Sequence, residues 1–346
     1  MKAFASKHKA LLIALGFFLL GLSAIYWFFL SPPSGPFMTK TIMIKKGSPL
    51  RKVSIRLEEE RIIRDANFFM GMTILLGKKK EIKAGEYEFH SSMHPWQVLN
   101  LLATGQTKYH LVTIAEGLTL SQVAQLLEDL DIVEKKTFLE KASSPALLLS
   151  LGLPYSVARK PVSTVEGYLF PSTYHLMREM NPEEIIQIMV HQFQKVFNQK
   201  LIQRASQLGL SQREAVILAS IIEKEASLPE EKPIVSAVFH NRLKKKMPLQ
   251  SDPTVIYGIK NFNGNLTRAD LERPSPYNTY LINGLPPTPI CNPGKDAILA
   301  ALYPSPVSHL YFVSRNDGSH HFSSTIEEHH RAVWKYQKRG ANKASK

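Results

Sequence analysis

An uncharged run of 21 residues near the N-terminus, at 10–30, constrains the fold of this chain more than any other feature. The run reads ALLIALGFFLLGLSAIYWFFL. As a helix it would be about 30 Å long at about 1.5 Å per residue, which matches the hydrocarbon core of a bilayer. The sequence therefore predicts one transmembrane helix at 10–30. The alternative is a signal peptide cleaved near Ser23 and Ala24, but the run continues apolar beyond them, which favours an uncleaved anchor.

The charges that flank this run predict its orientation. Lys2, Lys7 and Lys9 precede it, whereas the six residues after it carry no Lys or Arg. By the positive-inside rule the N-terminal tail, 1–9, would lie in the cytoplasm. We therefore expect a membrane-anchored, single-pass protein with the rest of the chain exported. A short Pro-rich linker at 31–38 would follow the span.

The formal net charge of +14 favours an acidic partner such as nucleic acid, anionic lipid or an anionic polymer. No run of five Lys or Arg occurs, and one cysteine cannot build a zinc finger, so we expect no nucleic-acid binding. The single Cys291 cannot form an internal disulfide and is expected to be a packed thiol.

A weak internal repeat organises the region at 39–133. The segment IKKGSPLRKVSIRLEEERII aligns with IAEGLTLSQVAQLLEDLDIV at an offset of 70, so that Gly47 meets Gly117. Each copy begins as a strand and continues as an amphipathic helix. Such βααβ units resemble LysM modules, which bind N-acetylated glycans. A generic strand–helix packing unit is the alternative interpretation.

The rest of the chain is predicted to be a mixed α/β domain at 161–340, joined by a connector at 134–160 and followed by a tail at 341–346. Helices are expected at about 182–205, 212–227 and 233–246, then a strand in LYFVSR and a C-terminal helix in TIEEHHRAVWKY. Between them, Pro, Gly, Asn and Tyr predict loops that shape a ligand site. The predicted fold class is thus α+β, with an N-terminal single transmembrane helix, a LysM-like βααβ region and a mixed α/β C-terminal domain.

Two carboxylates, Glu223 and Glu225, lie at the end of an apolar segment, LASIIEKEAS at 218–227. Ser211 and Glu214 form a capping box that starts this helix, and at about 100° per residue Glu223 and Glu225 point about 160° apart. The residues that share a face with Glu223 are small: Val216, Ala219, Ser220, Ala226 and Ser227. Those that share a face with Glu225 are bulky: Leu218, Ile221 and Ile222.

Small neighbours leave room for a ligand beside Glu223. A carboxyl group in mostly apolar surroundings has a raised pKa and can act as a general acid, as glycosidic cleavage requires. The alternative is that Glu223 is a buried structural carboxylate paired with an Arg or Lys. The helical wheel leaves both interpretations open.

Several segments together resemble the membrane-anchored endolytic lytic transglycosylases of the YceG-like family. They are AGEYEF, EGYLFPSTY, LASIIEKEA, VFHNRL, LQSDPTVIYG, YNTYLINGLPPTPI with NPG, LYFV and HHF, and they occur in family order. The resemblance implies a carbon–oxygen lyase that cleaves the MurNAc–GlcNAc bond within nascent peptidoglycan strands. It implies cleavage without water: the C6 hydroxyl of MurNAc closes on its own anomeric carbon and leaves a 1,6-anhydro-MurNAc end. The essential glutamate of the family falls on the first Glu of EKE, Glu223, as general acid and base.

The same resemblance suggests further site residues. Candidates for substrate binding are Gln250, Ser251, Asp252, Tyr277, Asn278 and Tyr280, although Asn and Pro also cluster in ordinary turns. Candidates for a supporting role are Glu225, Glu166 and His320. Two His pairs, at 320–321 and 329–330, could suggest zinc, but His321 and His330 depart from the family pattern. We expect no metal and no cofactor.

Two alternatives remain besides the transglycosylase. A muramidase-type hydrolase would differ only in using water, and a non-enzymatic peptidoglycan-binding scaffold would use the LysM-like region alone. The intact Glu223 in EKE argues against the scaffold. A DNA-binding membrane protein is a third and weaker hypothesis. The family also suggests cell-wall synthases of the penicillin-binding type as partners, and a periplasmic location for the catalytic domain.

Overall fold

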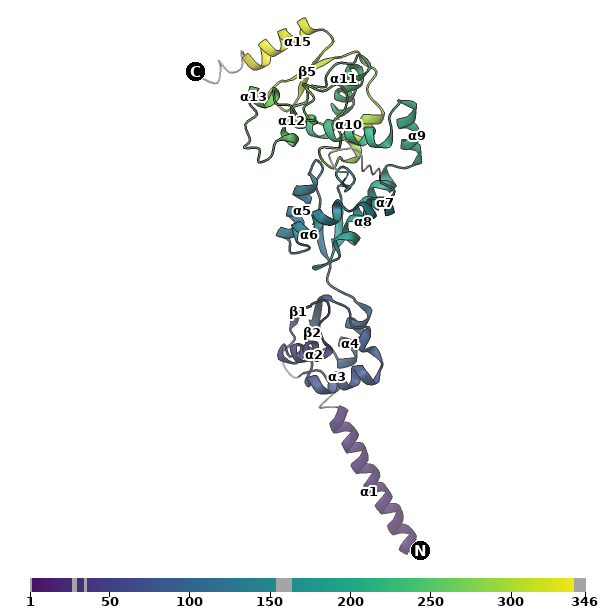
Figure 1. The fold of residues 1–346 in the computed structure, drawn as a ribbon. Helices are drawn as coiled ribbons and strands as arrows, with labels where there is room; N and C mark the ends of the chain where they lie inside the picture. Colours follow the sequence, from purple (N-terminus) through teal and green to yellow (C-terminus); the bar gives the residue numbers. More distant parts are fainter. Residues whose placement is uncertain (1, 27–29, 34–35, 154–163, 339–346) are drawn as a thin grey trace. The chain divides into compact units, whose positions relative to one another are not determined.

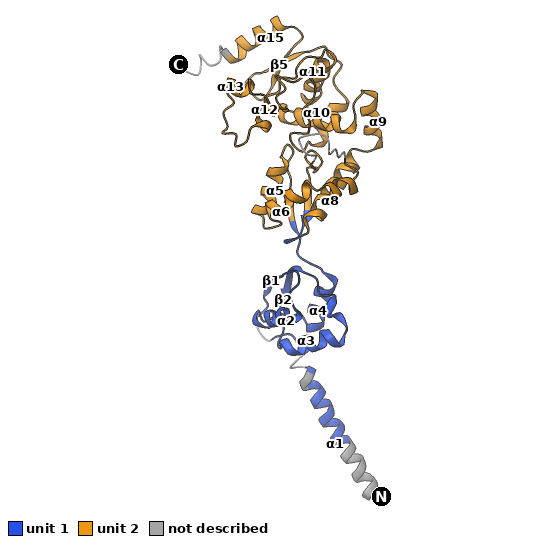
Figure 2. Cartoon of the chain, in the orientation of Figure 1, with its two compact units in different colours: residues 1–110, 175–180 blue, residues 111–174, 181–346 orange. Residues whose placement is uncertain are grey.

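The computed structural model of this chain describes residues 2–26, 30–33, 36–153 and 164–338. The chain divides into two compact units (Figure 2). Unit 1 comprises 1–110 and 175–180, and unit 2 comprises 111–174 and 181–346. The domain ranges predicted from the sequence stay a prediction.

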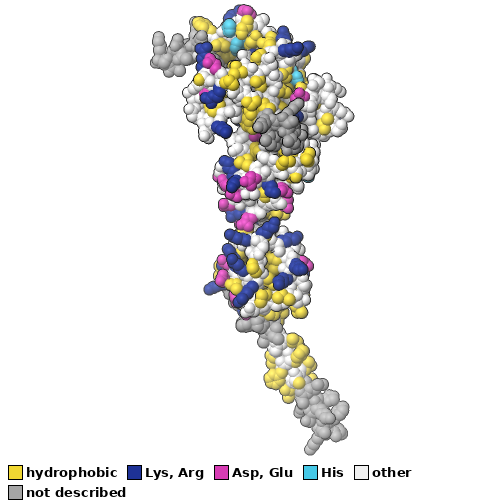
Figure 3. Space-filling model, in the orientation of Figure 1, with side chains coloured by type: hydrophobic (Ala, Val, Ile, Leu, Met, Phe, Trp, Pro, Cys, Tyr) yellow, Lys and Arg dark blue, Asp and Glu magenta, His cyan; other side chains and the backbone are white. Residues whose placement is uncertain are grey.

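Unit 1 packs helices around a two-stranded sheet (Figure 1). Its elements are α1 (Lys2–Ile25), β1 (Thr39–Ile44), α2 (Leu50–Glu59), α3 (Ala66–Leu75), the 3-10 turn η2 (Lys78–Lys80), β2 (Gly85–His90) and α4 (Pro95–Thr104). β1 and β2 are antiparallel, with Thr39 opposite His90 and Ile44 opposite Gly85. The core includes Leu57, Phe69, Tyr87, Phe89 and Leu102. Lys and Arg side chains are spread over the face of unit 1 that Figure 3 shows, as its basic composition predicts.

The predicted transmembrane helix at 10–30 is wrong. Among the described residues no helix is both long and apolar enough to cross a membrane. The single-pass inner-membrane location, with a cytoplasmic N-terminus and a periplasmic catalytic domain, was deduced from that helix and is corrected with it.

The two copies of the internal repeat belong to different units. The first copy contributes β1 and α2 to unit 1, and the helix of the second is α5 (Leu120–Asp129) in unit 2. Gly47 and Gly117 both have positive φ, at 78° and 77°, so the alignment matches equivalent turns. Between the units the chain runs through β3 (His110–Thr113) and β4 (Thr173–Leu176), which pair with each other.

Unit 2 is mainly helical. After α5 come α6 (Lys135–Ala142), α7 (Pro145–Ser150), α8 (Pro182–Val196), α9 (Gln199–Gln207), α10 (Gln212–Glu225), α11 (Lys232–Lys244), α12 (Asp252–Gly258), α13 (Arg268–Leu271) and α14 (Lys295–Leu302). The antiparallel hairpin β5 (Tyr311–Ser314) and β6 (His320–Ser323) follows, then α15 (Ile326–Val333) and the π-helical turn η3 (Trp334–Lys338). The mixed α/β character predicted for this region is confirmed.

The helix that carries the two candidate glutamates is the centre of unit 2. α10 begins at the predicted capping box, where Ser211 Oγ accepts the backbone N–H of Glu214. Every residue from 215 to 222 is buried, because α10 packs between α11 and α14. Its last turn emerges from this core and carries Glu223 and Glu225. The fold therefore presents both carboxylates from a rigid, fully packed support.

Candidate active site

Glu223 lies in a buried ion pair. Its side chain is 7% exposed, and Oε1 accepts a hydrogen bond from Lys232 Nζ at 2.8 Å, where Lys232 is 5% exposed. Oε2 accepts the backbone N–H of Gly294 at 2.9 Å. Gly294 is the N-cap of α14 and Lys232 begins α11. Both oxygens of Glu223 thus tie α10 to the starts of two neighbouring helices.

A second carboxylate adjoins this pair. Glu116 Oε2 lies 3.9 Å from Lys232 Nζ, and burial followed by the charge of Glu223 raises the pKa of Glu116. Two glycines let the backbone come close: a Cβ on Gly117 would stand 3.7 Å from Glu223 Cγ, and one on Gly294 would overlap Glu116. The small residues beside Glu223 therefore make room for other parts of the chain.

Glu225 has different surroundings. Ser251 Oγ donates a hydrogen bond to Glu225 Oε1 at 2.5 Å. Glu225 is partly buried and lines a cavity. This burial raises the pKa of Glu225 to about 7, the Ser251 hydroxyl lowers it in part, and the nearby charge of Asp252 raises it. Glu225 is thus a carboxylic acid that holds its proton near neutral pH.

The cavity beside Glu225 has a volume of about 460 Å³ and lies wholly within unit 2. Its walls come from α10, α11, the loop before α12, the β5–β6 hairpin and α15. The lining residues are Glu225, Arg242, Leu249, Gln250, Asp252, Tyr280, Phe312, Val313, Ser314, His320, His329, Val333 and Gln337. Five of the predicted site residues line this cavity: Glu225, Gln250, Asp252, Tyr280 and His320. A sixth, Ser251, does not line it but donates a hydrogen bond to Glu225.

Polar contacts fix the predicted residues on this wall. Tyr280 OH donates to Asp252 Oδ1 at 2.6 Å. Gln250 has a positive φ of 53°, and its backbone N–H donates to Thr279 O at 3.0 Å. Its Oε1 accepts from Arg242 Nη1 at 3.0 Å. The segment 250–252 is therefore held in one conformation along the cavity.

His320 enters the cavity wall from β6. Its ring Nδ1 lies 2.7 Å from Glu231 Oε2, and its backbone N–H donates to Glu231 Oε1 at 2.9 Å. His329, also on the wall, has an Nδ1 that is buried without a hydrogen-bond partner in the described part of the chain. Burial lowers the pKa of His329, so its ring is neutral near pH 7.

The other predicted residues lie outside this cavity and make contacts within the protein. Both oxygens of Glu166 accept the backbone N–H of Leu120 at the start of α5, at 2.9 and 3.0 Å, and Tyr257 OH and Asn292 Nδ2 donate to it at 3.1 and 3.3 Å. Burial raises the pKa of Glu166 to about 7. Tyr277 OH is bonded to Thr288 Oγ1 at 2.7 Å. Neither Glu166 nor Tyr277 lines the cavity described above.

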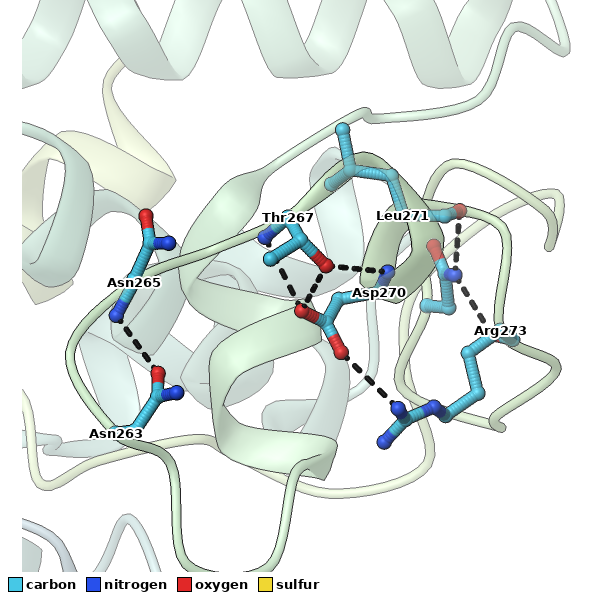
Figure 4. Close-up of polar contacts among 7 residues, drawn as sticks. Asn263, Asn265, Thr267, Asp270, Leu271 and Arg273 are labelled. Carbon is cyan, nitrogen blue, oxygen red and sulfur yellow. Dashed lines mark hydrogen bonds and ion pairs between the residues drawn. The ribbon is translucent and has the colours of Figure 1, made fainter.

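Asn278 is fully buried and organises the loop before it. Its amide Nδ2 donates to the carbonyl oxygens of Leu271 and Arg273, each at 2.9 Å. In the same loop Thr267 caps α13, its backbone N–H donates to Asp270 Oδ2 at 3.1 Å, and Asp270 Oδ1 lies 3.2 Å from Arg273 Nη2 (Figure 4). With its amide used in this way, Asn278 supports the segment that leads to Tyr280.

Sequence reasoning missed Arg242, the cation on the cavity wall. Its Nε donates to Leu310 O at 2.7 Å, and Nη1 donates to the carbonyls of Pro248 and Leu249 at 3.1 Å. Its guanidinium lies 5.2 Å from the centre of the Tyr311 ring. The signal that could have found it is the segment VFHNRL, which the resemblance includes. Phe312, Ser314 and His329 were missed because they come from far along the sequence.

No group of three or more His, Cys, Asp or Glu side chains lies close enough to hold a metal ion within the described ranges. The groups on the cavity wall that can transfer protons or form hydrogen bonds are Glu225, His320, Tyr280, Asp252 and Arg242.

Comparisons with known proteins agree with one another. A family model described as the YceG-like family matches residues 42–335. The chain is 32% identical over 307 residues to an endolytic murein transglycosylase of Bacillus subtilis (strain 168), covering 86% of this chain and 85% of that protein. It is 30% identical over 324 residues to one of Streptococcus pneumoniae serotype 2 (strain D39), covering 85% of this chain and 57% of that protein. The crystal structure of a YceG-like protein from Listeria monocytogenes is similar with a TM-score of 0.59 and 33% identity, covering 86% of this chain and all of that one.

Proposed function

Since the chain belongs to the YceG-like family it is a lytic transglycosylase of peptidoglycan, and we propose that it cleaves the MurNAc–GlcNAc bond within glycan strands, with Glu225 as general acid. The observation that carries this proposal is a carboxylic acid with a pKa of about 7 on the wall of a cavity of about 460 Å³. A general acid must hold its proton at the working pH and must reach the substrate. Glu225 meets both requirements.

This proposal moves the catalytic role from the first to the second glutamate of EKE. Glu223 is engaged through both oxygens, with Lys232 Nζ and Gly294 N–H, and it does not line the cavity. Both oxygens of Glu223 are thus occupied by donors of the protein itself, and neither is presented to a ligand in the cavity. We therefore assign to Glu223 the structural role of joining α10 to α11 and α14.

The proposed reaction has two stages. The Glu225 carboxylic acid gives its proton to the glycosidic oxygen while the bond from that oxygen to C1 of MurNAc breaks. The C6 hydroxyl of the same sugar then attacks C1, and its proton passes to a base. The product is a 1,6-anhydro-MurNAc end, and no water is consumed. A single carboxylate can serve as acid and then as base, because after the first stage Glu225 is a carboxylate.

Asp252 supports a second candidate, the muramidase-type hydrolase. It lies on the same cavity wall as Glu225, and glycoside hydrolases use such a pair of carboxyl groups to activate water or to form a covalent intermediate. Tyr280 OH donates to Asp252 Oδ1 at 2.6 Å, which holds that carboxyl group in position on the wall. The two candidates differ in their products, so one experiment separates them.

The test is the digestion of purified uncrosslinked glycan strands by the full chain and by Glu225→Gln and Glu223→Gln, with the products identified by mass spectrometry. We expect anhydro-MurNAc ends from the wild type, and a loss of about 10²–10⁴-fold in rate for Glu225→Gln. The control Tyr277→Phe, whose hydroxyl is bonded to Thr288 outside the cavity, should cleave at the wild-type rate. Reducing ends, one water heavier, would establish the hydrolase, and full activity in Glu225→Gln would remove this residue from the mechanism.

A further inference from the structure

The reaction needs a base for the C6 hydroxyl, and the cavity contains a second group suited to proton transfer. His320 lies on the cavity wall, and its side chain is 14% exposed. Its Nδ1 is paired with Glu231 Oε2 at 2.7 Å, and the side chain of Glu231 is 11% exposed. If Glu225 acted as both acid and base, neither His320 nor Glu231 would have a role in the reaction. This carboxylate–imidazole pair therefore requires its own explanation.

The hydrogen bonds of Glu231 assign the tautomer of His320. One oxygen of Glu231 accepts the backbone N–H of His320, and the other faces ring Nδ1. Because an ionised carboxylate can only accept, the proton of the neutral ring lies on Nδ1. Nε2 then carries the lone pair, and no described residue bonds to it. A carboxylate that holds Nδ1–H of a histidine in this way orients the ring and stabilises the imidazolium formed when Nε2 takes a proton.

The start of α11 links this pair to the helix that carries Glu225. Glu231 and Lys232 are consecutive: Glu231 bonds to His320 on β6, and Lys232 bonds to Glu223 on α10. The contacts of Glu231 and Lys232 therefore connect β6 and α10 through adjacent residues at the start of α11. On α10, Glu223 lies two residues before Glu225. Packing of the His320 ring against Phe312, at 5.3 Å between ring centres, restricts it further. The imidazole and the Glu225 carboxyl group are thus held on one cavity wall by a rigid frame.

We propose that His320 is the base of the second stage, with Glu231 as its positioning residue; this inference rests on the proposed function. As the O6–C1 bond forms, the O6–H bond breaks and its proton moves to Nε2 of His320. Glu225 has by then given its own proton to the leaving oxygen. The cycle ends when the imidazolium of His320 loses a proton to solvent and Glu225 gains one. Acid and base are therefore two residues, and each remains in the correct protonation state for its own step.

Two substrates that differ only in the leaving group separate the two roles. The first is a short peptidoglycan strand whose scissile MurNAc carries GlcNAc, which must be protonated to leave. The second is the same strand ending in a MurNAc 4-nitrophenyl glycoside, whose nitrophenolate leaves without a proton. Glu225→Gln should lose about 10²–10⁴-fold in kcat on the first substrate and recover most of it on the second. His320→Asn should lose about 10²-fold or more on both, because the base is needed with either leaving group.

The variants are chosen to keep the fold. An Asn side chain at 320 retains an N–H donor for Glu231 and lacks a basic nitrogen. His321→Asn is the matched control: it is the next residue of β6, lies outside this cavity and should have no effect on either substrate. Glu231→Gln leaves the imidazole in place and should lower kcat on both substrates with little change in KM. If thermal denaturation shows that His320→Asn does not fold, Glu231→Gln is used to test the inference in its place.

Wild-type rates for His320→Asn on both substrates would overturn the inference. It would also be overturned if Glu225→Gln were equally slow on both substrates while His320→Asn retained its rate on the first, because Glu225 would then be acid and base together. With either of these two results the wild type would still produce anhydro-MurNAc ends. If the wild type gave no anhydro-MurNAc ends, the proposed function itself would fail. The presence or absence of these ends in the wild-type digest therefore distinguishes a failure of the proposed function from a failure of the His320 inference.

Discussion

The two glutamates of EKE should change the stability of the protein in opposite directions when each is replaced by glutamine. Burial raises the pKa of Glu225 from 4.5 to about 7, so the folded protein binds this proton more tightly than the unfolded chain does. Its contribution to stability is therefore fully present below pH 4.5 and is lost as the pH rises through about 7. At about 1.4 kcal/mol for each tenfold change in proton binding, ionised Glu225 costs the folded state about 3 kcal/mol at pH 8.

Glu225→Gln removes this cost, because glutamine does not ionise and its amide oxygen can still accept the Ser251 hydroxyl. We expect the variant to be more stable than the wild type by about 3 kcal/mol at pH 8, and by less than about 1 kcal/mol at pH 5. Glu223→Gln instead leaves Lys232, 5% exposed, without its partner at 2.8 Å and with only the more distant Glu116 carboxylate at 3.9 Å. Breaking a buried pair costs roughly 3–5 kcal/mol, so this variant should be less stable than the wild type at pH 8.

The assay is thermal denaturation of the full chain at pH 5 and pH 8, followed by circular dichroism, with both variants measured beside the wild type. Glu166 also has a pKa raised to about 7 by burial, but it is present in all three proteins and cancels in the comparison. Equal stabilisation of Glu225→Gln at the two pH values would show that ionisation is not its cause. A Glu225→Gln variant less stable than the wild type at pH 8 would refute the assignment of a protonated acid to this position.

Three further predictions concern the cavity and its support. Ser251→Ala removes the hydroxyl that lowers the pKa of Glu225, so the decline of kcat at alkaline pH should move to higher pH, which a pH–rate profile measures. Tyr280→Phe should raise KM for glycan with a smaller effect on kcat, because it removes a hydroxyl from the cavity wall; a loss confined to kcat would contradict a binding role. Asn278→Ala should destabilise unit 2 by about 2 kcal/mol or more in thermal denaturation, since it leaves the carbonyls of Leu271 and Arg273 without their donor.

Local features of the fold were predictable from the sequence. The capping box at Ser211 and Glu214 and the apolar run after it are complete within a few residues, and α10 follows them closely. The predicted long helix at 182–205 is interrupted, because Asn198 caps a new helix, α9, with its side chain accepting the N–H of Lys200. The length of the N-terminal apolar run predicted a span, whereas no helix among the described residues, α1 (Lys2–Ile25) included, is both long and apolar enough to cross a membrane.

The site was predictable only in part. Gln250, Ser251, Asp252 and Tyr280 do gather around the cavity, as the motif suggested. The helical wheel, however, interpreted the small residues beside Glu223 as space for a ligand. In the structure that space is taken by the backbone at Gly117 and Gly294, which are distant in sequence from α10. The opposite wall of the cavity comes from β5, β6 and α15, and a wheel drawn for one helix contains no information about them.

The two carboxyl groups at the end of this apolar helix have different surroundings because each meets a different end of a helix. The C-terminus of α10 carries a partial negative charge, which disfavours an ionised carboxylate at Glu225, its last residue, and adds to the effect of burial. Glu223 meets the N-terminus of α14 through Gly294 N–H, where the partial charge is positive, and it also meets Lys232. These contacts of Glu223 fix the last turn of α10 in place, and Glu225 on that turn is thereby held at the cavity. A single helix end thus provides both the rigid support and the acid.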